Sequence, residues 1–238
     1  MVPAPGVDRV VEVATPQGPG RLHVREAAEP SAVLALGHGA GGGVDAPDLA
    51  ALAGRLPDEG VTVLRLEQPW RVAGRKVAVR PPLLDEAWLA GLHGVAAALG
   101  PGLPLVLGGR SAGARVACRT AGGLGAVGVV CLGFPLHPPG RPERSRLEEL
   151  LLPDVARLVL QGSRDTFGPA TELREALAGA GDDAAGAGGV RVVELPGADH
   201  GGRVPRAAVP TAPDLRGLLV REVGAFVAAL VAGGGIPA

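Results

Sequence analysis

A serine, an aspartate and a histidine occur in this chain in surroundings that suit nucleophilic catalysis. Ser111 stands in a Gly-x-Ser-x-Gly motif between the apolar residues 105–107 and the helix-forming residues 114–118. This motif is typical of a tight turn from a strand into a helix, in which the two glycines leave room for the turn. We therefore predict that Ser111 is a nucleophile, exposed at the end of a buried strand.

A serine hydroxyl is a poor nucleophile at neutral pH, so it needs a histidine to accept its proton and a carboxylate to orient that histidine. Asp165 follows a predicted strand at residues 156–162, and His200 follows a predicted strand at residues 190–195. The chain order Ser111, Asp165, His200 is that of α/β-hydrolases. These three residues are the predicted catalytic residues.

Two other aspartates compete with Asp165 for the orienting role. Asp154 precedes the same strand and is interpreted as a loop or cap residue. Asp199 adjoins His200, and a residue on the same turn rarely reaches the ring nitrogen of its neighbour. Asp165 is therefore favoured.

A glycine-rich loop at residues 37–43 follows the predicted strand 32–36. Its flexibility would let a backbone N–H turn toward a developing negative charge, so we assign the oxyanion hole to the amides of Ala40 and Ala112. His38 is expected to organise this loop by hydrogen bonding. A phosphate cradle is the alternative interpretation, but no Gly-Lys-Ser/Thr follows the loop.

Strands and helices alternate along the chain, which favours a mostly parallel, twisted sheet with helices on both faces. The first two strands are expected to form an antiparallel hairpin at the sheet edge. Residues 182–189 are predicted to be a surface loop, and no stretch is long enough for a large lid domain. The prediction is one α/β-hydrolase domain over residues 1–238, with a minimal lid or none. The strands are expected at residues 10–14, 21–25, 32–36, 61–66, 105–107, 127–132, 156–162 and 190–195, and the helices at 47–56, 83–99, 114–118, 169–178 and 215–231.

The composition fits a compact enzyme of the cytoplasm. With 238 residues and 47% apolar content the chain can bury a large core, and its net charge of −1 argues against general binding to nucleic acid or membrane surfaces. No signal peptide or membrane span is recognisable, and Cys118 and Cys131 are interpreted as reduced core thiols. No metal-binding motif occurs, and neither a metal nor another cofactor is expected.

The substrate pocket is less well defined, because aromatic residues make up 2% of the chain. Four arginines, Arg71, Arg75, Arg110 and Arg203, fall in loops near the predicted site and could hold a carboxylate or phosphate of a small-molecule substrate. A solvated loop face in an arginine-rich chain explains them equally well. His137 is expected either to line the pocket or to brace its own proline-rich loop. The residues predicted to contact substrate are His38, Trp70, Arg71, Arg110, Phe134, His137 and Phe167.

Four segments together resemble the bacterial branch of a small α/β-hydrolase-like family. They are residues 37–42, 67–75, 133–140 and 161–168. That family is related to dienelactone hydrolases and shares its domain with a regulatory subunit of the animal NSL histone-acetylation complex. The resemblance covers nearly the whole chain and implies the fold and a Ser-Asp-His site. Dienelactone hydrolases have a cysteine where this chain has Ser111, so their lactone chemistry is not carried over.

The sequence thus predicts a serine hydrolase that cleaves a carboxylic ester or thioester of a small substrate through an acyl-enzyme. Some relatives imply a different class of function, in which the α/β-hydrolase fold is a scaffold for protein or ligand binding with weak or no chemistry. An intact set of catalytic residues favours the enzyme. Nothing in the sequence indicates the oligomeric state.

Overall fold

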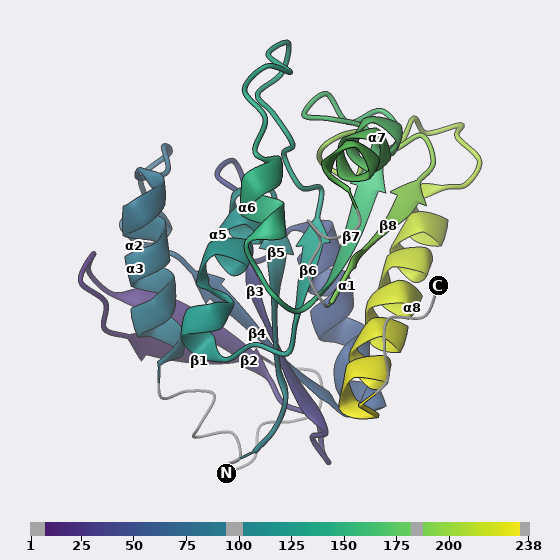
Figure 1. Cartoon of the computed structure of the whole chain (residues 1–238). Helices are drawn as coiled ribbons and strands as arrows, with labels where there is room; N and C mark the ends of the chain where they lie inside the picture. Colours follow the sequence, from purple (N-terminus) through teal and green to yellow (C-terminus); the bar gives the residue numbers. More distant parts are fainter. Residues whose placement is uncertain (1–7, 94–101, 182–187, 234–238) are drawn as a thin grey trace.

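The computed structural model describes residues 8–93, 102–181 and 188–233. These residues form an eight-stranded sheet in the order β1-β2-β4-β3-β5-β6-β7-β8 (Figure 1). From β3 to β8 the strands are parallel, whereas β1 and β2 pair antiparallel at one edge, as predicted. The strands are β1 (Arg9–Val13), β2 (Gly20–Arg25), β3 (Ala32–Gly37), β4 (Val61–Glu67), β5 (Leu105–Arg110), β6 (Gly128–Leu132), β7 (Ala156–Gly162) and β8 (Val190–Leu195).

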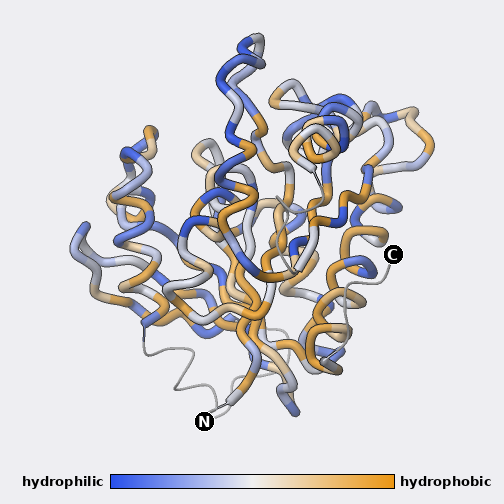
Figure 2. The backbone as a smooth tube through the Cα atoms, in the orientation of Figure 1, coloured by the Kyte–Doolittle hydropathy of each residue, from blue (hydrophilic) through white to orange (hydrophobic). Residues whose placement is uncertain are grey.

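Helices cover both faces of this sheet (Figure 1). One face carries α1 (Pro47–Arg55) and α8 (Ala212–Val231), and the other carries α3 (Pro81–Leu92), α5 (Ala112–Thr120) and α7 (Ala170–Ala180). Alternate residues of a strand point to opposite faces, so each buried strand contributes to both cores. In β3, for example, Val33 and Ala35 join the α3/α5 core, whereas Leu34 and Leu36 join the α1/α8 core. Figure 2 shows the hydrophobic residues concentrated along these central strands.

Helix α8 begins three residues before the predicted start. The Thr211 side chain accepts a hydrogen bond from the Asp214 N–H, and the Asp214 carboxylate accepts one from the Thr211 N–H. This reciprocal capping satisfies backbone donors at the helix start and fixes its first turn. None of the helices in the described residues, α8 included, combines the length and hydropathy that crossing a bilayer requires.

Two short helices were not predicted, α2 (Pro69–Val72) and α6 (Leu147–Leu151). Each is about one turn long, so neither shows a helical repeat in the sequence. The helix predicted at residues 83–99 is observed as α3; its residues 94–99 lie outside the described residues, as do residues 182–187 of the predicted surface loop. Two turns of 3₁₀ helix, η1 (Leu56–Glu59) and η2 (Gly122–Leu124), complete the elements.

The strand order reverses direction around β3, and this reversal determines where a ligand can approach. After β3 the chain crosses to the face that carries α1, whereas after the neighbouring strand β5 it crosses to the face that carries α5. The two connections therefore diverge and leave a crevice at the carboxyl ends of the strands, the usual ligand site of open α/β sheets. The loop at residues 37–43 and the turn at Ser111 both lie at this edge.

Candidate active site

The turn at Ser111 brings backbone segments into unusually close contact. Ser111 lies between β5 and α5 at φ 51°, and among the described residues it is the one non-glycine residue with positive φ. A Cβ atom added to Gly109 would lie 2.5 Å from the Gly37 carbonyl oxygen, and one added to Gly113 would lie 2.2 Å from the same atom. The sequence predicted a steric requirement for both glycines at this turn, and the structure shows that the requirement comes from packing against β3.

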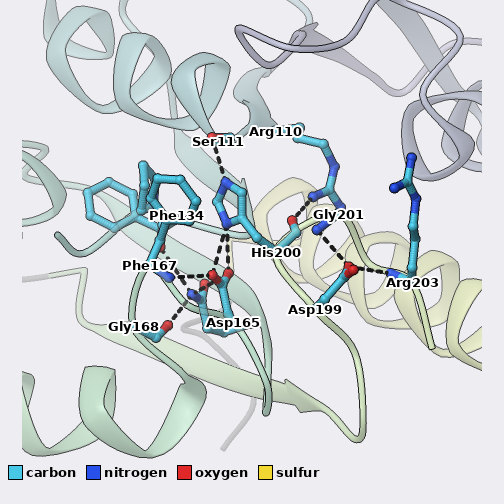
Figure 3. Close-up of polar contacts among 12 residues, drawn as sticks. Arg110, Ser111, Phe134, Asp165, Phe167, Gly168, Asp199, His200, Gly201 and Arg203 are labelled. Carbon is cyan, nitrogen blue, oxygen red and sulfur yellow. Dashed lines mark hydrogen bonds and ion pairs between the residues drawn. The ribbon is translucent and has the colours of Figure 1, made fainter. Parts of the chain in front are cut away.

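Hydrogen bonds connect the three predicted catalytic side chains in one line (Figure 3). The Nε2 atom of His200 lies 2.8 Å from the Ser111 Oγ, and its Nδ1 lies 2.8 Å from Oδ2 and 3.0 Å from Oδ1 of Asp165. An ionised carboxylate only accepts, so a neutral imidazole here carries its hydrogen on Nδ1 and leaves Nε2 to accept the serine proton. The structure thus brings Ser111, His200 and Asp165 together.

Asp165 is held by donors besides the histidine. It is 2% exposed, and it accepts hydrogen bonds from the Phe167 N–H at 2.8 Å and from the Gln161 side-chain amide at 3.1 Å. The Phe167 ring stacks on the His200 imidazole with ring centroids 4.0 Å apart. These contacts fix the carboxylate and the ring, so the imidazole has little freedom to leave the serine.

Asp199, the rival carboxylate, faces away from the histidine ring. Its Oδ1 accepts hydrogen bonds from the N–H groups of Gly201 and Arg203, at 2.8 and 2.9 Å, and so closes the turn that carries His200 (Figure 3). The carboxylate that contacts the imidazole is that of Asp165. Asp199 therefore shapes the loop around His200, while Asp165 meets the ring.

Arg110 contacts the backbone of the turn that carries His200. Its NH1 group donates to the His200 carbonyl oxygen at 2.6 Å, and its Nε is paired with the carboxylate of Asp48 at the start of α1. Both side chains of the ion pair are nearly buried, with 12% and 8% of their surfaces exposed. Arg110 was predicted to bind substrate; in this structure its Nε and NH1 groups contact Asp48 and the His200 carbonyl, and the residue also lines the pocket at Ser111.

The loop at residues 37–43 is organised by His38, as expected. The His38 Nδ1–H donates to the Gly39 carbonyl at 2.9 Å, and Nε2 accepts from the Gln68 N–H at 3.1 Å. The bond that Nε2 accepts needs the neutral ring, and burial lowers the pKa of His38 below its ordinary value. The amides of Ala40 and Ala112, predicted to form the oxyanion hole, donate to no other described residue, and both residues line the pocket beside Ser111.

A pocket of about 990 Å³ opens at Ser111 and His200. Three of the seven residues predicted to contact substrate line it, Arg71, Arg110 and Phe167. His38 and Trp70 instead line a small cavity of about 10 Å³, which also borders Ala40 and Ala112 and has room for about one water molecule. Both side chains are buried, and their ring centroids lie 5.6 Å apart.

Phe134 and His137, the other two residues predicted to contact substrate, also lie off the large pocket. Phe134 is fully buried in the core of the α3/α5 face. His137 is 6% exposed, and its Nε2 lies 2.9 Å from a Glu172 carboxylate oxygen without hydrogen-bond geometry. Phe134 was expected to face the site, but its side chain packs into the core. His137 follows the alternative expectation: its Nδ1 lies 2.8 Å from the Pro138 carbonyl oxygen, within its own proline-rich loop.

The pocket wall also contains residues that the sequence did not single out. Arg115 lies one helical turn after Ser111 on α5, Arg146 precedes α6, and Arg216 lies in the first turns of α8. The spacing of Arg115 from the serine was a usable signal, because residues four apart share a helix face. No local pattern relates Arg146 or Arg216 to the site. No group of three or more His, Cys, Asp or Glu side chains in the described part of the chain could hold a metal ion.

Comparison with known protein families gives one match over most of the chain. A family model described as "alpha/beta hydrolase domain" matches residues 30–228. This segment runs from just before β3 to near the end of α8 and includes all three residues of the hydrogen-bonded line. No curated protein matches the chain in sequence.

Several solved structures share the fold. An alpha-beta serine hydrolase homologue from Coxiella burnetii is 18% identical with a TM-score of 0.67, over 93% of this chain and 99% of that one. A Xanthomonas campestris protein, described as an a/b serine hydrolase without lid, is 21% identical with a TM-score of 0.66, over 94% and 96%. A thermostable carboxyl esterase from Bacillus coagulans is 11% identical with a TM-score of 0.73, over 94% and 99%. At these identities the likeness concerns the fold.

Proposed function

The chain belongs to the alpha/beta hydrolase domain family, and on that premise we propose that it is a serine hydrolase that cleaves a carboxylic ester or thioester of a small substrate. One observation carries the proposal: the unbroken line of hydrogen bonds from Ser111 through His200 to Asp165, at the mouth of a pocket large enough for a small molecule. The fold shared with a carboxyl esterase supports it.

In the proposed first half-reaction, the Ser111 Oγ attacks the carbonyl carbon of the substrate while His200 Nε2 takes the hydroxyl proton. Asp165 stays ionised, keeps the hydrogen of the imidazole on Nδ1 and stabilises the imidazolium that forms. The carbonyl oxygen becomes an oxyanion, which the free N–H groups of Ala40 and Ala112 would bind. The C–O or C–S bond then breaks, and His200 gives its proton to the departing alcohol or thiol.

In the second half-reaction, water attacks the acyl-Ser111 ester. His200 removes a proton from the water, the same two amides hold the second oxyanion, and His200 returns the proton to Ser111 as the acid leaves. The pocket around Ser111 is open to solvent in this structure, so water has direct access to the acyl-enzyme. No step needs a cofactor.

Two of the four segments that carry the family resemblance, residues 37–42 and 161–168, contribute residues to the candidate site. On this basis the proposal includes a closer relationship to dienelactone hydrolases and to the regulatory subunit of the animal histone-acetylation complex. We also propose a cytoplasmic location, supported by two buried cysteines that form no disulfide. A scaffold function is disfavoured, because a protein without chemistry has no need for a serine in strained backbone conformation aligned with a histidine.

Labelling by a fluorophosphonate probe tests the proposal. The probe reacts with a serine only when a neighbouring base and an oxyanion hole activate it, so we expect a covalent adduct on the tryptic peptide that contains Ser111. The control is His200→Ala, which keeps the serine and removes the base; its labelling should be slower by orders of magnitude. A wild-type protein that stays unlabelled and turns over no p-nitrophenyl acetate would be a scaffold.

A further inference from the structure

Arginine side chains surround the pocket at Ser111. Six arginines and two aspartates from the described residues contribute to its wall, which gives the wall a formal charge of +4, whereas the whole chain carries −1. The positive charge is therefore local to the pocket and not a property of the chain. The arginines are Arg71, Arg110, Arg115, Arg146, Arg203 and Arg216, and the aspartates are Asp45 and Asp48.

Part of this charge is already used within the protein. Arg110 is paired with Asp48, and Arg115 makes two hydrogen bonds to Glu149, at 2.5 and 3.0 Å. Burial alone would raise the pKa of Glu149, but the bonds from Arg115 and its neighbour Arg119 outweigh burial and lower it. The carboxylate is therefore ionised and neutralises much of the Arg115 charge.

Arg146 has no carboxylate partner among the described residues, but it donates a hydrogen bond to the Pro135 carbonyl oxygen at 3.2 Å. The other three pocket arginines have no side-chain partner at all. The side chains of Arg71, Arg203 and Arg216 make no ion pair or hydrogen bond with any residue that the structure describes. They come from three separate elements: α2 after β4, the turn after His200, and the first turns of α8. In Figure 3 the Arg203 side chain extends beside the turn that carries His200. Three unpaired guanidinium groups thus converge on one pocket from different parts of the chain.

Two further features of the wall favour an anion. The N-terminal residues of α1, α5 and α8 all line the pocket, and a helix N-terminus carries partial positive charge. The two acidic residues of the wall face other arginines: Asp48 is paired with Arg110, and Asp45, which is 92% exposed, lies 3.8 Å from Arg65. A guanidinium presents its donors in a planar fork that matches the oxygens of a carboxylate or phosphate.

We propose that the substrate of this pocket carries a carboxylate or phosphate group, bound by Arg71, Arg203 and Arg216 while Ser111 attacks its ester-like bond. This inference rests on the proposed hydrolase function and names the substrate class of the same site. Leu195, Val204, Leu215 and Leu219 also line the pocket beside these arginines. The expected substrate is thus a small anionic ester with an apolar portion.

The first experiment compares esters that differ in one charge. On the acyl side, p-nitrophenyl hemisuccinate is measured against p-nitrophenyl pentanoate; on the leaving-group side, 4-acetoxybenzoate is measured against 4-acetoxybenzamide. We expect kcat/KM to be about 10-fold higher for the charged member of at least one pair, with the advantage falling as salt rises from 20 to 500 mM, because exposed charges are screened. The pair that shows the preference tells on which side the anion binds.

A third comparison identifies the anion. Benzoate and phenyl phosphate are tested as inhibitors of p-nitrophenyl acetate hydrolysis, with benzamide as the uncharged reference. We expect at least one of the two anions to inhibit competitively and benzamide to inhibit more weakly. The stronger of the two anions distinguishes a carboxylate substrate from a phosphate substrate.

Variants then assign the preference to residues. Arg71→Gln, Arg203→Gln and Arg216→Gln should each reduce the ratio of charged to neutral kcat/KM, mainly through KM, and the triple variant should bring the ratio close to one. Arg75→Gln is the matched control. Arg75 is also exposed and unpaired among the described residues, but it lines a different cavity, so its variant should keep the ratio.

Equal rates for both pairs, together with no inhibition by either anion, would overturn the inference. A charge preference that survives the triple variant would overturn the assignment to these three arginines. Neither result touches the hydrolase proposal, which is read separately from p-nitrophenyl acetate turnover and fluorophosphonate labelling. Thermal unfolding of each variant shows whether the variant is folded. Because the side chains of these arginines have no partner among the described residues, we expect every variant to fold.

Discussion

The Ser111 hydroxyl owes its position to a backbone that is strained but well supported. Its φ of 51° lies in a region that costs a non-glycine residue about 1–3 kcal/mol. The Ser111 N–H donates to the Leu132 carbonyl at 3.0 Å, and its carbonyl accepts from the Arg115 N–H at 3.2 Å. Backbone hydrogen bonds of Ser111 thus hold it in the strained conformation, while its hydroxyl contacts the His200 ring. The hydroxyl should therefore matter for chemistry and little for packing.

Ser111→Ala tests this distinction. Loss of the nucleophile should lower kcat for p-nitrophenyl acetate by roughly 10⁴-fold or more, because only the oxyanion hole and substrate binding remain. The melting temperature should stay close to that of the wild type, since alanine keeps the same backbone and Cβ. Turnover in the variant equal to that of the wild type would exclude Ser111 as the nucleophile.

His38 makes the stability of the protein depend on pH. Burial lowers the pKa of His38 in the folded protein below the value of 6.5 expected when it is unfolded. Between these two values the unfolded chain binds more protons, so the contribution of His38 to the free energy of unfolding is complete above about pH 7 and declines as pH falls below 6.5. At low pH a protonated ring would also lose the hydrogen bond from the Gln68 N–H.

Comparison with His38→Gln isolates this effect. The free energy of unfolding in urea is measured for both proteins between pH 7.5 and 5.0. We expect the wild type to be the more stable protein at pH 7.5 and its advantage to shrink as pH falls. A difference that stays constant over this range would mean that the pKa of His38 is not lowered by folding.

The residues of the site were predictable to different degrees. Ser111, Asp165 and His200 each follow a strand in a turn of recognisable composition, so local sequence was enough to select them. Arg110 also adjoins the nucleophile, but its partner Asp48 lies 62 positions away, and only the fold shows that its charge is already paired. Whether an arginine is free to bind substrate is decided by such distant contacts, which leave no local pattern.

Among the elements, the contact of α5 with β3 is the closest in the site. Because a Cβ on Gly113 would lie 2.2 Å from the Gly37 carbonyl, Gly113→Ala must push the start of α5 away from β3, and Ser111 with it. We expect a loss of stability of about 2–4 kcal/mol and little remaining esterase activity. Gly122→Ala, just beyond the end of the same helix, is the control, because nothing lies within 4 Å of its added Cβ. Equal stability of the two variants, measured in urea, would contradict this close approach.

The ion pair between Asp48 on α1 and Arg110 at the end of β5 joins two elements to the histidine loop. Asp48→Asn keeps the shape of the side chain but removes the charge that holds Arg110, which in turn holds the His200 carbonyl. We expect kcat to fall roughly 10- to 100-fold, since a small displacement of the base is costly, with a smaller change in KM. Steady-state kinetics measure the split, and a change in KM alone would instead make Arg110 a substrate-binding residue.

At the same scale, the strands and long helices were predictable because they have a periodic pattern, and the short elements were not. The four residues of α2 and the five of α6 are too few to show such a pattern, yet both shape the pocket wall through Arg71 and through the segment around Arg146. Helix α6 is joined to α5 by the Arg115–Glu149 ion pair, a contact between residues 34 positions apart. A short element that depends on its neighbours is determined by tertiary structure.

For the whole molecule, the order of the strands decides where chemistry takes place. Alternating strands and helices predict a parallel sheet, but buried strands of similar composition do not reveal their neighbours. The position of β3 between β4 and β5 therefore depends on the packing of the complete chain. This strand order places the loop at residues 37–43, which carries the Ala40 amide, next to Ser111 and leaves an open crevice between them. In the described residues no domain lies over this crevice, and the wall consists of loops and helix ends.

An open, arginine-lined pocket should select short acyl chains. Each methylene gains about 0.8 kcal/mol only when it is fully buried, whereas a long chain here would remain partly hydrated and would remove water from guanidinium groups that it cannot pair. We expect kcat/KM for p-nitrophenyl esters to be highest between acetyl and hexanoyl and to fall by at least about 10-fold toward palmitoyl. The series is measured below the solubility limit of each ester, with a detergent-free control. A steady rise of kcat/KM with chain length would show that the aliphatic side chains on the wall, and not the arginines, control selection.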